Sequence, residues 1–355
     1  MSKIYVYLLL GLSIIFSFSC DYIKNKENAF SITFSHSQIS HGTYITALIQ
    51  HSQNSFDSVK FSIDTVSLLF PYSSSNSYQI PTSALTLGKK NITTNIYESG
   101  QTYSFSNAIT VVSDITPVYP KYTVLNTYNH AIDAYTQGLE FSGDSLYEST
   151  GIKGESSLRL VQYKKGSILK KIDVLPEYFG EGLTILHDIV YQITWQAQTG
   201  FMYDKASFRQ IGTFSYGTEG WGLCNDGTFL IMSDGSEFLY FYNPETFSLV
   251  KQIAVYDNAG PVSQLNELEY VQGYIYANVY TTNFIVKIDA ATGKVVQRIN
   301  FSNILDKAYM HDNIDVLNGI AWHKTNNTFF ITGKRWPILF EIQIQDSVAE
   351  SKPLM

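Results

Sequence analysis

The run QGLEF, Gln137 to Phe141, decides the fold of this 355-residue chain, because related runs recur at four later points. The later copies are EGLTI from Glu181, WGLCN from Trp221, NELEY from Asn266 and NGIAW from Asn318. Their first residues lie 44, 40, 45 and 52 positions apart. Self-similarity at a period of this length indicates a repeat architecture.

Each copy is followed by a second strand-like run. These runs are SLYESTG from Ser145, IVYQITW from Ile189, TFLIMSDG from Thr228, YIYANVY from Tyr274 and TFFITGK from Thr328. An outer hairpin follows in four of the five units, whereas the fifth stops after ILFEIQI. Four strands per unit are typical of a β-propeller blade, and we expect KYTVLNTY, Lys121–Tyr128, to supply the missing outer strand.

The repeat therefore predicts an all-β chain with a five-bladed β-propeller over residues 119–346. A sandwich whose motif recurs by chance is the alternative. Ahead of the repeat, alternating segments between residues 29 and 113 are separated by Ser, Asn and Gly clusters, which is typical of a small immunoglobulin-like β-sandwich. We expect a tether and this sandwich over residues 21–118, as a spacer or docking module, with the proline-containing stretch Asp114–Pro120 as the boundary.

The first twenty residues, MSKIYVYLLLGLSIIFSFSC, combine Lys3, an apolar stretch and Ser19-Cys20, and predict a signal peptide over residues 1–20. A small residue before Cys20 resembles a bacterial lipoprotein cleavage site, so we expect lipidation of Cys20; ordinary signal cleavage is the alternative. The chain is then expected to be exported to the bacterial cell envelope, as a lipoprotein anchored through Cys20 or a periplasmic protein.

Composition narrows the classes of function. The net charge is −7 and no Lys/Arg-rich run occurs, which argues against a nucleic-acid partner. The second cysteine, Cys224, has no intrachain partner if Cys20 is lipidated. The sequence has no CxxC or HExxH motif, so we predict no protein-built zinc site and no cofactor. We expect a monomer.

In a propeller the first strand of each blade lines the central channel, so equal positions of the repeat form rings. The first ring is Gln137, Glu181, Trp221, Asn266 and Asn318. The ends of the second runs add Thr150, Trp195, Asp234, Tyr280 and Lys334, with Trp336 beside the last. Taken singly, each has an ordinary structural explanation. Together, aromatic walls with converging polar groups predict a small-molecule pocket.

Glu181 is the only carboxylate of the first ring and stands between two glycines, Gly180 and Gly182. We expect these glycines to let the strand enter the channel mouth closely and to leave open space around Glu181 for a substrate group.

These residues belong to longer motifs: YTQGLEF, LYESTG, FGEGLT, QITW, EGWGL, SDGS, LNELEY, ANVY, DVLNGIAW and TGKRWP. In this order they resemble the plant-and-bacterial type of glutaminyl-peptide cyclotransferase, a family of five-bladed propeller enzymes, over about Tyr128 to Ile342. The resemblance implies an acyltransferase that converts the N-terminal glutamine of a peptide or protein into pyroglutamate and releases ammonia, without a catalytic metal.

Carried over by position, the resemblance implies that Glu181 is the catalytic acid/base and that Gln137, Asn266 and Lys334 are its polar partners. Lys334 is the first choice to stabilise the oxyanion, with the amides of Asn266 or Gln137 as alternatives. The implied pocket aromatics are Tyr135, Trp195, Trp221 and Tyr280. Tyr135 replaces the family's usual Phe, Tyr280 its usual Trp and Asn129 its usual Pro, which bears on pocket shape and polarity.

Two other functions fit the same residues. One is a non-catalytic propeller that binds peptide N-termini or a partner protein. The other is a calcium-dependent lactonase or other hydrolase, which would need oxygen ligands to converge on one cation. The available residues for such a site are Glu181, Asn266, Asn318 and Asp234.

Overall fold

The computed structural model describes residues 30–52 and 55–345. The predicted signal peptide and Cys20 lie outside these residues. The chain divides into two compact units: the first takes the described residues up to Leu85 together with Lys89–Thr110, and the second takes Thr86–Gly88 and the described residues from Val111 on.

Both units are built from β-strands, and the prediction of an all-β chain is confirmed. The one helical element in the described part of the chain is a 3₁₀ turn, η1 (Lys307–Tyr309). No described helix is long and apolar enough to cross a membrane.

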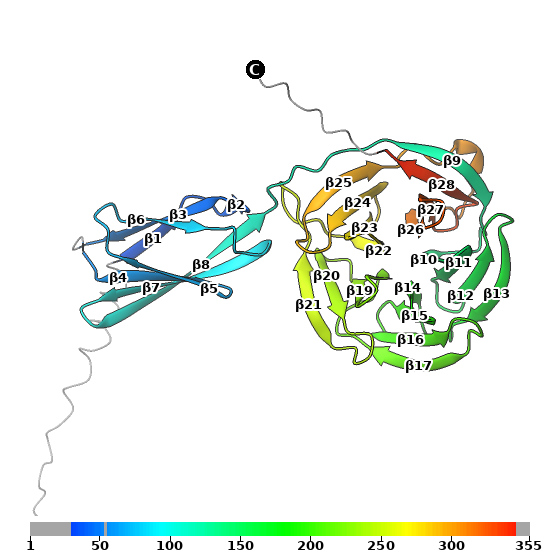
Figure 1. The fold of residues 1–355 in the computed structure, drawn as a ribbon, viewed down its shortest axis with the longest axis horizontal. Helices are drawn as coiled ribbons and strands as arrows, with labels where there is room; N and C mark the ends of the chain where they lie inside the picture. Colours follow the sequence, from blue (N-terminus) through cyan, green and yellow to red (C-terminus); the bar gives the residue numbers. More distant parts are fainter. Residues whose placement is uncertain (1–29, 53–54, 346–355) are drawn as a thin grey trace, which may run out of the picture. The chain divides into compact units, whose positions relative to one another are not determined.

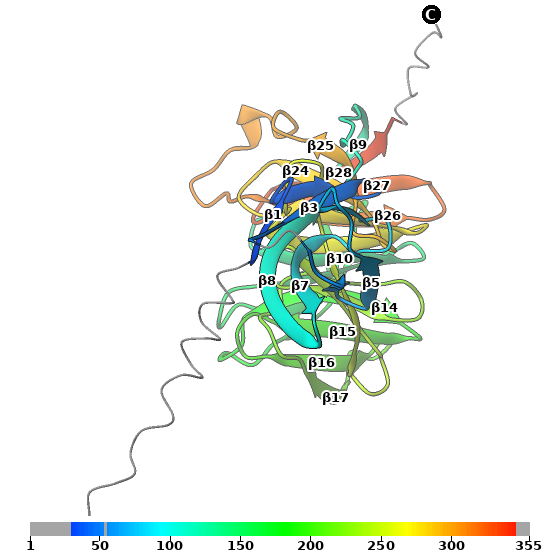
Figure 2. The same ribbon diagram turned by 90° about the vertical axis from the view of Figure 1, so that its left-hand side faces the viewer.

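The first unit contains two sheets, with strand orders β1-β3-β6 and β2-β8-β7-β4-β5. Alternate residues of β3 and β4 are buried, as in strands with one face on a core. The long strand β8 curves along its length (Figure 2). The strands are β1 (Phe30–Phe34), β2 (Gln38–Ser40), β3 (Tyr44–His51), β4 (Ser58–Ile63), β5 (Val66–Pro71), β6 (Ser77–Pro81), β7 (Gly88–Glu98) and β8 (Gln101–Val112).

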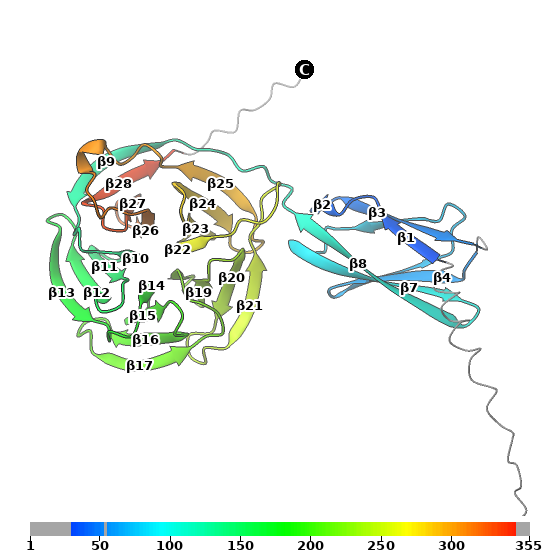
Figure 3. The same cartoon turned by 180° about the vertical axis from the view of Figure 1, so that it is seen from behind.

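The second unit contains five four-stranded antiparallel sheets, and in the first four the strands pair in chain order. The sheets surround a common centre, with the first strand of each nearest the centre and the fourth outermost (Figure 1). The same order is seen from behind (Figure 3).

The strands of the first two sheets are β10 (Thr136–Ser142), β11 (Ser145–Thr150), β12 (Ser157–Gln162) and β13 (Ser167–Asp173), then β14 (Gly180–Leu186), β15 (Ile189–Thr194), β16 (Thr199–Asp204) and β17 (Gln210–Ser215). Those of the next two are β18 (Leu223–Asn225), β19 (Leu230–Ser233), β20 (Phe238–Tyr242) and β21 (Leu249–Ala254), then β22 (Leu265–Val271), β23 (Tyr274–Val279), β24 (Phe284–Asp289) and β25 (Val295–Asn300).

The fifth sheet joins the two ends of the second unit. It contains β26 (Leu317–His323), β27 (Thr328–Gly333), β28 (Ile338–Ile344) and β9 (Tyr122–Asn129), in that order. β9 pairs antiparallel with β28, so the predicted addition of the run before the first copy to the last unit is confirmed. This ladder pairs the outer edge of β28, which would otherwise be unpaired.

Apolar clusters fill the spaces between neighbouring sheets around the whole ring. Between the fifth and first sheets, for example, Leu139 and Leu146 pack with Phe330 and Leu339. Four further clusters lie between the other neighbouring pairs. Burial of these side chains is the main free-energy gain that holds the sheets together.

The repeated glycine is explained by the close approach of inner strands. A Cβ atom at Gly182 would lie 2.3 Å from the backbone N of Leu223, and one at Gly138 would lie 2.5 Å from that of Leu183. Such contacts cannot be relieved by a side-chain rotation. In the fourth copy Glu267 takes this position, and its carboxyl group accepts hydrogen bonds from the backbone N–H groups of Leu139 in the first sheet and of Ile320 in the fifth sheet.

Candidate active site

A pocket of about 200 Å³ lies where the inner strands of the ring begin. Its lining residues are Tyr135, Gln137, Phe179, Glu181, Trp195, Trp221, Asn266, Tyr280 and Lys334. The structure thus brings together all of the residues to which the family resemblance assigns a role, from all five repeat units. Phe179 is the lining residue that the sequence interpretation missed.

Irregular pairing aims the polar side chains at the pocket. Gln137, Glu181 and Asn266 are each the second residue of an inner strand. The register of their sheets shifts at this point, between Gly180 and Leu183 in the second sheet for example. β-bulges of this kind redirect side chains and occur often beside active sites.

Glu181 is buried, and its Oε2 atom has no hydrogen-bond partner among the described residues. Burial raises the pKa of the Glu181 carboxyl well above its usual value of 4.5. The nearby ammonium of Lys334 opposes this rise, and the carboxylate of Glu219 adds to it. A carboxyl group in such a setting exchanges protons closer to neutral pH than an exposed one, as a general acid/base requires.

Lys334 is also buried and lies between two aromatic rings. Its Nζ atom is 4.8 Å from the ring centroid of Tyr135 and 4.8 Å from that of Tyr280. These cation–π contacts hold the ammonium in place. Burial lowers the pKa of Lys334 below its usual value of 10.5, while Glu181 and Asp315 counteract the shift.

A single carboxylate oxygen positions two walls of the pocket. Oε2 of Glu219 accepts hydrogen bonds from the indole N–H of Trp195 at 2.8 Å and of Trp221 at 3.0 Å. Burial raises the pKa of Glu219, but these bonds and one from Gln196 lower it more, so the net shift is downward. Glu219 therefore stays ionised and orients both indoles, a role that the sequence interpretation missed.

Two further contacts complete the rim. The hydroxyl of Tyr135 donates to Oδ2 of Asp315 at 2.7 Å, and Phe179 makes edge contacts with the rings of Tyr135 and Trp195. Burial and the bond to Asp315 raise the pKa of the Tyr135 hydroxyl, which stays protonated.

Phe179 and Glu219 could have been found from the repeat. Each stands two residues before a member of the first ring, as Tyr135 stands two residues before Gln137. The position two before each copy is therefore part of the site in at least three of the five units.

Four residues that the sequence places in the two rings do not line the pocket. Thr150 is buried, and its hydroxyl shares a hydrogen bond with that of Ser157 at 2.8 Å. Asn318 is buried and its Nδ2 group donates to the backbone O of Thr136 and to Oε1 of Gln137, both at 3.0 Å. Asp234 accepts hydrogen bonds from Ser236 and from the hydroxyl of Tyr240.

Trp336 is the fourth. It packs in the core of the last sheet, and its indole N–H donates to the backbone O of Asp315. The hydrogen bonds of all four are consistent with structural roles around the pocket. Oδ1 of Asn318 is buried without a hydrogen-bond partner among the described residues.

Only two of the four residues that could supply oxygen ligands to calcium line the pocket. Glu181 and Asn266 line the pocket, whereas Asn318 and Asp234 are engaged elsewhere. No group of three or more His, Cys, Asp or Glu side chains suited to a metal ion occurs in residues 30–52 and 55–345.

The fold and the site together define an all-β protein with a buried carboxyl group and a lysine in an aromatic pocket. A pocket of this kind is suited to proton transfer on a small substrate group. The family model described as glutamine cyclotransferase matches residues 99–344. The chain belongs to this family, as its motifs predict.

Two relatives agree with this assignment. A glutaminyl-peptide cyclotransferase of Arabidopsis thaliana is 40% identical over 235 residues, which cover 64% of this chain and 72% of that protein. The crystal structure of Myxococcus xanthus glutaminyl cyclase superposes with a TM-score of 0.61 at 35% identity, covering 65% of this chain and 99% of the other. Both relatives are named as enzymes, so a non-catalytic role is not favoured.

Proposed function

We propose that this protein converts the N-terminal glutamine of peptides or proteins into pyroglutamate and releases ammonia, with Glu181 as the general acid/base. The observation that carries the proposal is the Glu181 carboxyl group, buried in the pocket with an unpaired oxygen and a raised pKa. Membership of the glutamine cyclotransferase family supplies the reaction.

Binding prepares the substrate for ring closure. The α-amine and the γ-carbonyl carbon belong to one residue, so the pocket has only to exclude extended rotamers and bring the two groups together. The indoles of Trp195 and Trp221, fixed by Glu219, and the ring of Phe179 supply rigid walls for this purpose.

Proton transfer follows the change in bonding. The neutral α-amine forms a bond to the side-chain carbonyl carbon, and the nitrogen then gives a proton to the Glu181 carboxylate. The same proton passes to the amide nitrogen as its bond to carbon breaks, so ammonia leaves and Glu181 returns to its starting state. One carboxyl group thus serves both steps, typically worth about a hundred- to ten-thousand-fold in rate.

The tetrahedral intermediate carries negative charge on oxygen. Lys334 is placed to stabilise this charge, because Tyr135 and Tyr280 hold its ammonium in a buried pocket where electrostatic attraction is strong. The amides of Gln137 and Asn266, on neighbouring walls, are neutral donors for the same oxygen.

The test is ammonia release from a short peptide that begins with Gln. We expect Glu181→Gln to lower kcat at least about a hundredfold. The matched control is Glu245→Gln, the same change at an exposed site on an outer turn, which should leave kcat unchanged. Full activity in Glu181→Gln would refute the assigned role. Activity should persist with a chelator, and its loss would refute metal-independent catalysis.

The five sheets of the second unit are, in this proposal, the blades of a β-propeller spanning residues 119–346. The sequential strand order, the completion of the last sheet by β9 and the apolar clusters between neighbours support this architecture. The first unit is proposed to be an immunoglobulin-like sandwich, supported by its two antiparallel sheets. A crystal structure with other than five blades would overturn the first point.

Export and lipidation at Cys20 remain part of the proposal, supported by the apolar run and the Ser19-Cys20 pair. Membrane fractionation of cells that express the full chain tests both. The protein should be found with membranes, and Cys20→Ala should release it; an unchanged distribution would exclude the anchor.

A further inference from the structure

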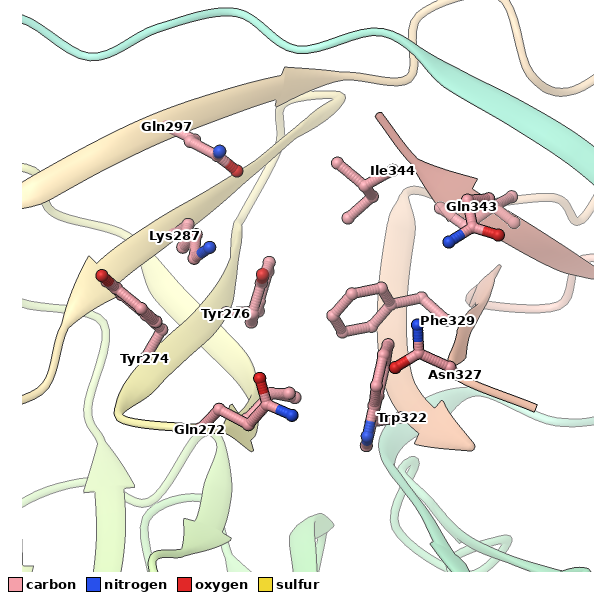
Figure 4. Close-up of a pocket in the computed structure, with 12 residues that line it drawn as sticks. Gln272, Tyr274, Tyr276, Lys287, Gln297, Trp322, Asn327, Phe329, Gln343 and Ile344 are labelled. Atoms are coloured by element: carbon pink, nitrogen blue, oxygen red, sulfur yellow. The ribbon is translucent and has the colours of Figure 1, made fainter. Parts of the chain in front are cut away.

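A second cavity, of about 210 Å³, lies between the fourth and fifth sheets (Figure 4). One side carries Gln272, Tyr274, Tyr276, Lys287 and Gln297, and the other carries Trp322, Asn327, Phe329, Gln343 and Ile344 (Figure 4). Val271 and Ile342 complete the lining. The glutamine cyclotransferase reaction uses none of these residues.

This cavity is separate from the Glu181 pocket, with which it shares no lining residue. The distance between the two pockets can be estimated along strand β22. Asn266, near the start of the strand, lines the Glu181 pocket, and Val271, at its end, lines the second cavity. Five residues of strand span about 17 Å. A ligand of the second cavity would therefore lie near the opposite end of the inner strands.

Aromatic rings form its floor. The ring of Phe329 is 4.6 Å from that of Tyr276 and 4.6 Å from that of Trp322, centroid to centroid. Phe329 and Tyr276 are buried, whereas Trp322 and Tyr274 are only partly buried and keep ring surface accessible. Rings held by such packing offer a rigid apolar surface on which a ligand can stack.

Side-chain amides supply the polar groups. Gln272 and Asn327 are exposed and stand in the tight turns of facing hairpins, with φ values of 50° and 57°. Gln297 and Gln343 add two more amides. Each amide offers both donor and acceptor atoms, which is what a set of hydroxyl groups requires.

Charge contributes little to this cavity. No carboxylate belongs to the lining. The one cation, Lys287, has its Nζ atom 4.2 Å from the ring centroid of Tyr274 and 5.6 Å from that of Tyr276, so its charge is directed to ring faces. The cavity is thus suited to an uncharged ligand rather than to an ion.

Gln297 adds an unsatisfied acceptor. Its Oε1 atom is buried without a hydrogen-bond partner among the described residues. An unpaired buried acceptor is unfavourable. A turn of the amide toward the cavity would let a ligand hydroxyl donate to it and remove the penalty.

From these observations we propose that the second cavity binds a neutral saccharide unit. The C–H face of a sugar ring would stack on Trp322, and its hydroxyls would pair with the amides of Gln272, Asn327 and Gln343. The volume is about seven times the share of one molecule in liquid water, ~30 Å³. It is therefore large enough for a ligand on the scale of one sugar ring.

A peptide is the other occupant to consider, and the lining favours it less. The strands that carry most of the lining are β23, β24, β27 and β28, and each pairs with a strand on both sides. A peptide could not add a strand there, which is how extended chains are often bound at β-sheets.

Saturation-transfer NMR on the full-chain protein tests the proposal, with maltose, lactose and N,N′-diacetylchitobiose as probes. At least one disaccharide should receive saturation on its ring protons. Trp322→Ala should weaken its binding about tenfold, and Gln272→Ala and Gln343→Ala about threefold or more each. Ammonia release from a Gln-peptide should be unchanged in all three variants.

Trp195→Ala, in the Glu181 pocket, is the matched control and should leave saccharide binding intact. Three results would overturn the proposal: no transfer to any of the three sugars, binding that persists unchanged in all the second-cavity variants, or loss of binding in Trp195→Ala instead. Preferential transfer to a Gly-Ser-Gly-Ser peptide that disappears in Gln272→Ala would identify a peptide site. Since Gln272 and Gln343 are exposed, their variants test binding even if Trp322→Ala fails to fold.

Discussion

Asn318 donates a hydrogen bond from Nδ2 to Oε1 of Gln137 at 3.0 Å, across 181 positions of sequence. The bond joins the fifth sheet to the first, at the seam that closes the ring. Because the amide oxygen of Gln137 is occupied, its Nε2 group is the part left to face a ligand. Asn318 does not line the pocket. It nevertheless determines that Gln137 presents hydrogen-bond donors to the pocket.

Asn318→Ala should therefore impair catalysis through Gln137. The Gln137 amide loses the donor that fixes its orientation, and we expect kcat/KM for a Gln-peptide to fall about tenfold, the effect of one lost buried hydrogen bond. Asn303→Ala, at an exposed loop position, is the control. Gln137→Ala in the Asn318→Ala background should have little further effect; two fully additive losses would contradict the positioning role.

The dependence of kcat on pH should be bell-shaped. Both limbs should lie closer to neutral pH than the usual pKa values of a glutamate and a lysine. Glu181 acts from its carboxylate form, and its raised pKa means that activity is lost as pH falls through a value above the ordinary 4.5. Lys334 acts as an ammonium, and its lowered pKa means that activity is lost as pH rises through a value below 10.5. Steady-state kcat from pH 4 to 11 measures both limbs.

The alkaline limb has its own control. Lys334→Met should remove that limb as well as lower kcat, because the titrating ammonium is gone. An alkaline limb that stays in place would assign it to another group, such as the substrate or a tyrosine.

Glu219→Gln separates the charge of Glu219 from its hydrogen bonds. The amide oxygen can still accept from the indoles, but the negative charge that helps to raise the pKa of Glu181 is lost. The acid limb should shift to lower pH, with KM changed less than in Glu219→Ala, which frees both indoles. The α-amine of the substrate titrates equally in every variant, so the difference reports the enzyme. An acid limb that does not move would show that the Glu219 charge is not felt at Glu181.

Gly182→Ala should destabilise the second unit. Its new Cβ would lie 2.3 Å from the Leu223 nitrogen and 2.7 Å from the Gly222 carbonyl carbon, so the two inner strands must separate. We expect the free energy of unfolding to fall by about 3 kcal/mol. Gly217→Ala is the matched control, since nothing lies within 4 Å of its Cβ position. Equal denaturation midpoints for the two variants would contradict the close-approach explanation.

Much of the site could be predicted because the chain repeats. Equal positions in the repeat have equal heights along the inner strands, so Gln137, Glu181 and Asn266 had to lie at one level once the sheets formed a ring. The long-range pairing of β9 with β28 followed from the same counting, since the last unit was one strand short.

The glycines beside Glu181 show where such counting misleads. We expected them to leave space around the carboxylate, but the Cβ positions of Gly180 and Gly182 are taken up by backbone atoms of Thr150 and Leu223. Close packing of inner strands, not room for a ligand, requires glycine there. A single sequence cannot distinguish the two, because the neighbouring backbone is supplied by a different repeat unit.

By itself the sequence determined the all-β class, the family and the level at which the polar residues stand, because each depends on residue type and spacing along one chain. Only the tertiary structure decided which side chains reach the pocket. Asn318 and Asp234 share repeat positions with pocket residues, yet their polar groups bond to Gln137 and Tyr240 instead. Glu219 became a positioning residue because two indoles from neighbouring sheets converge on its carboxylate. Side-chain direction depends on local bulges and on partners from other sheets, and neither is contained in the period of the repeat.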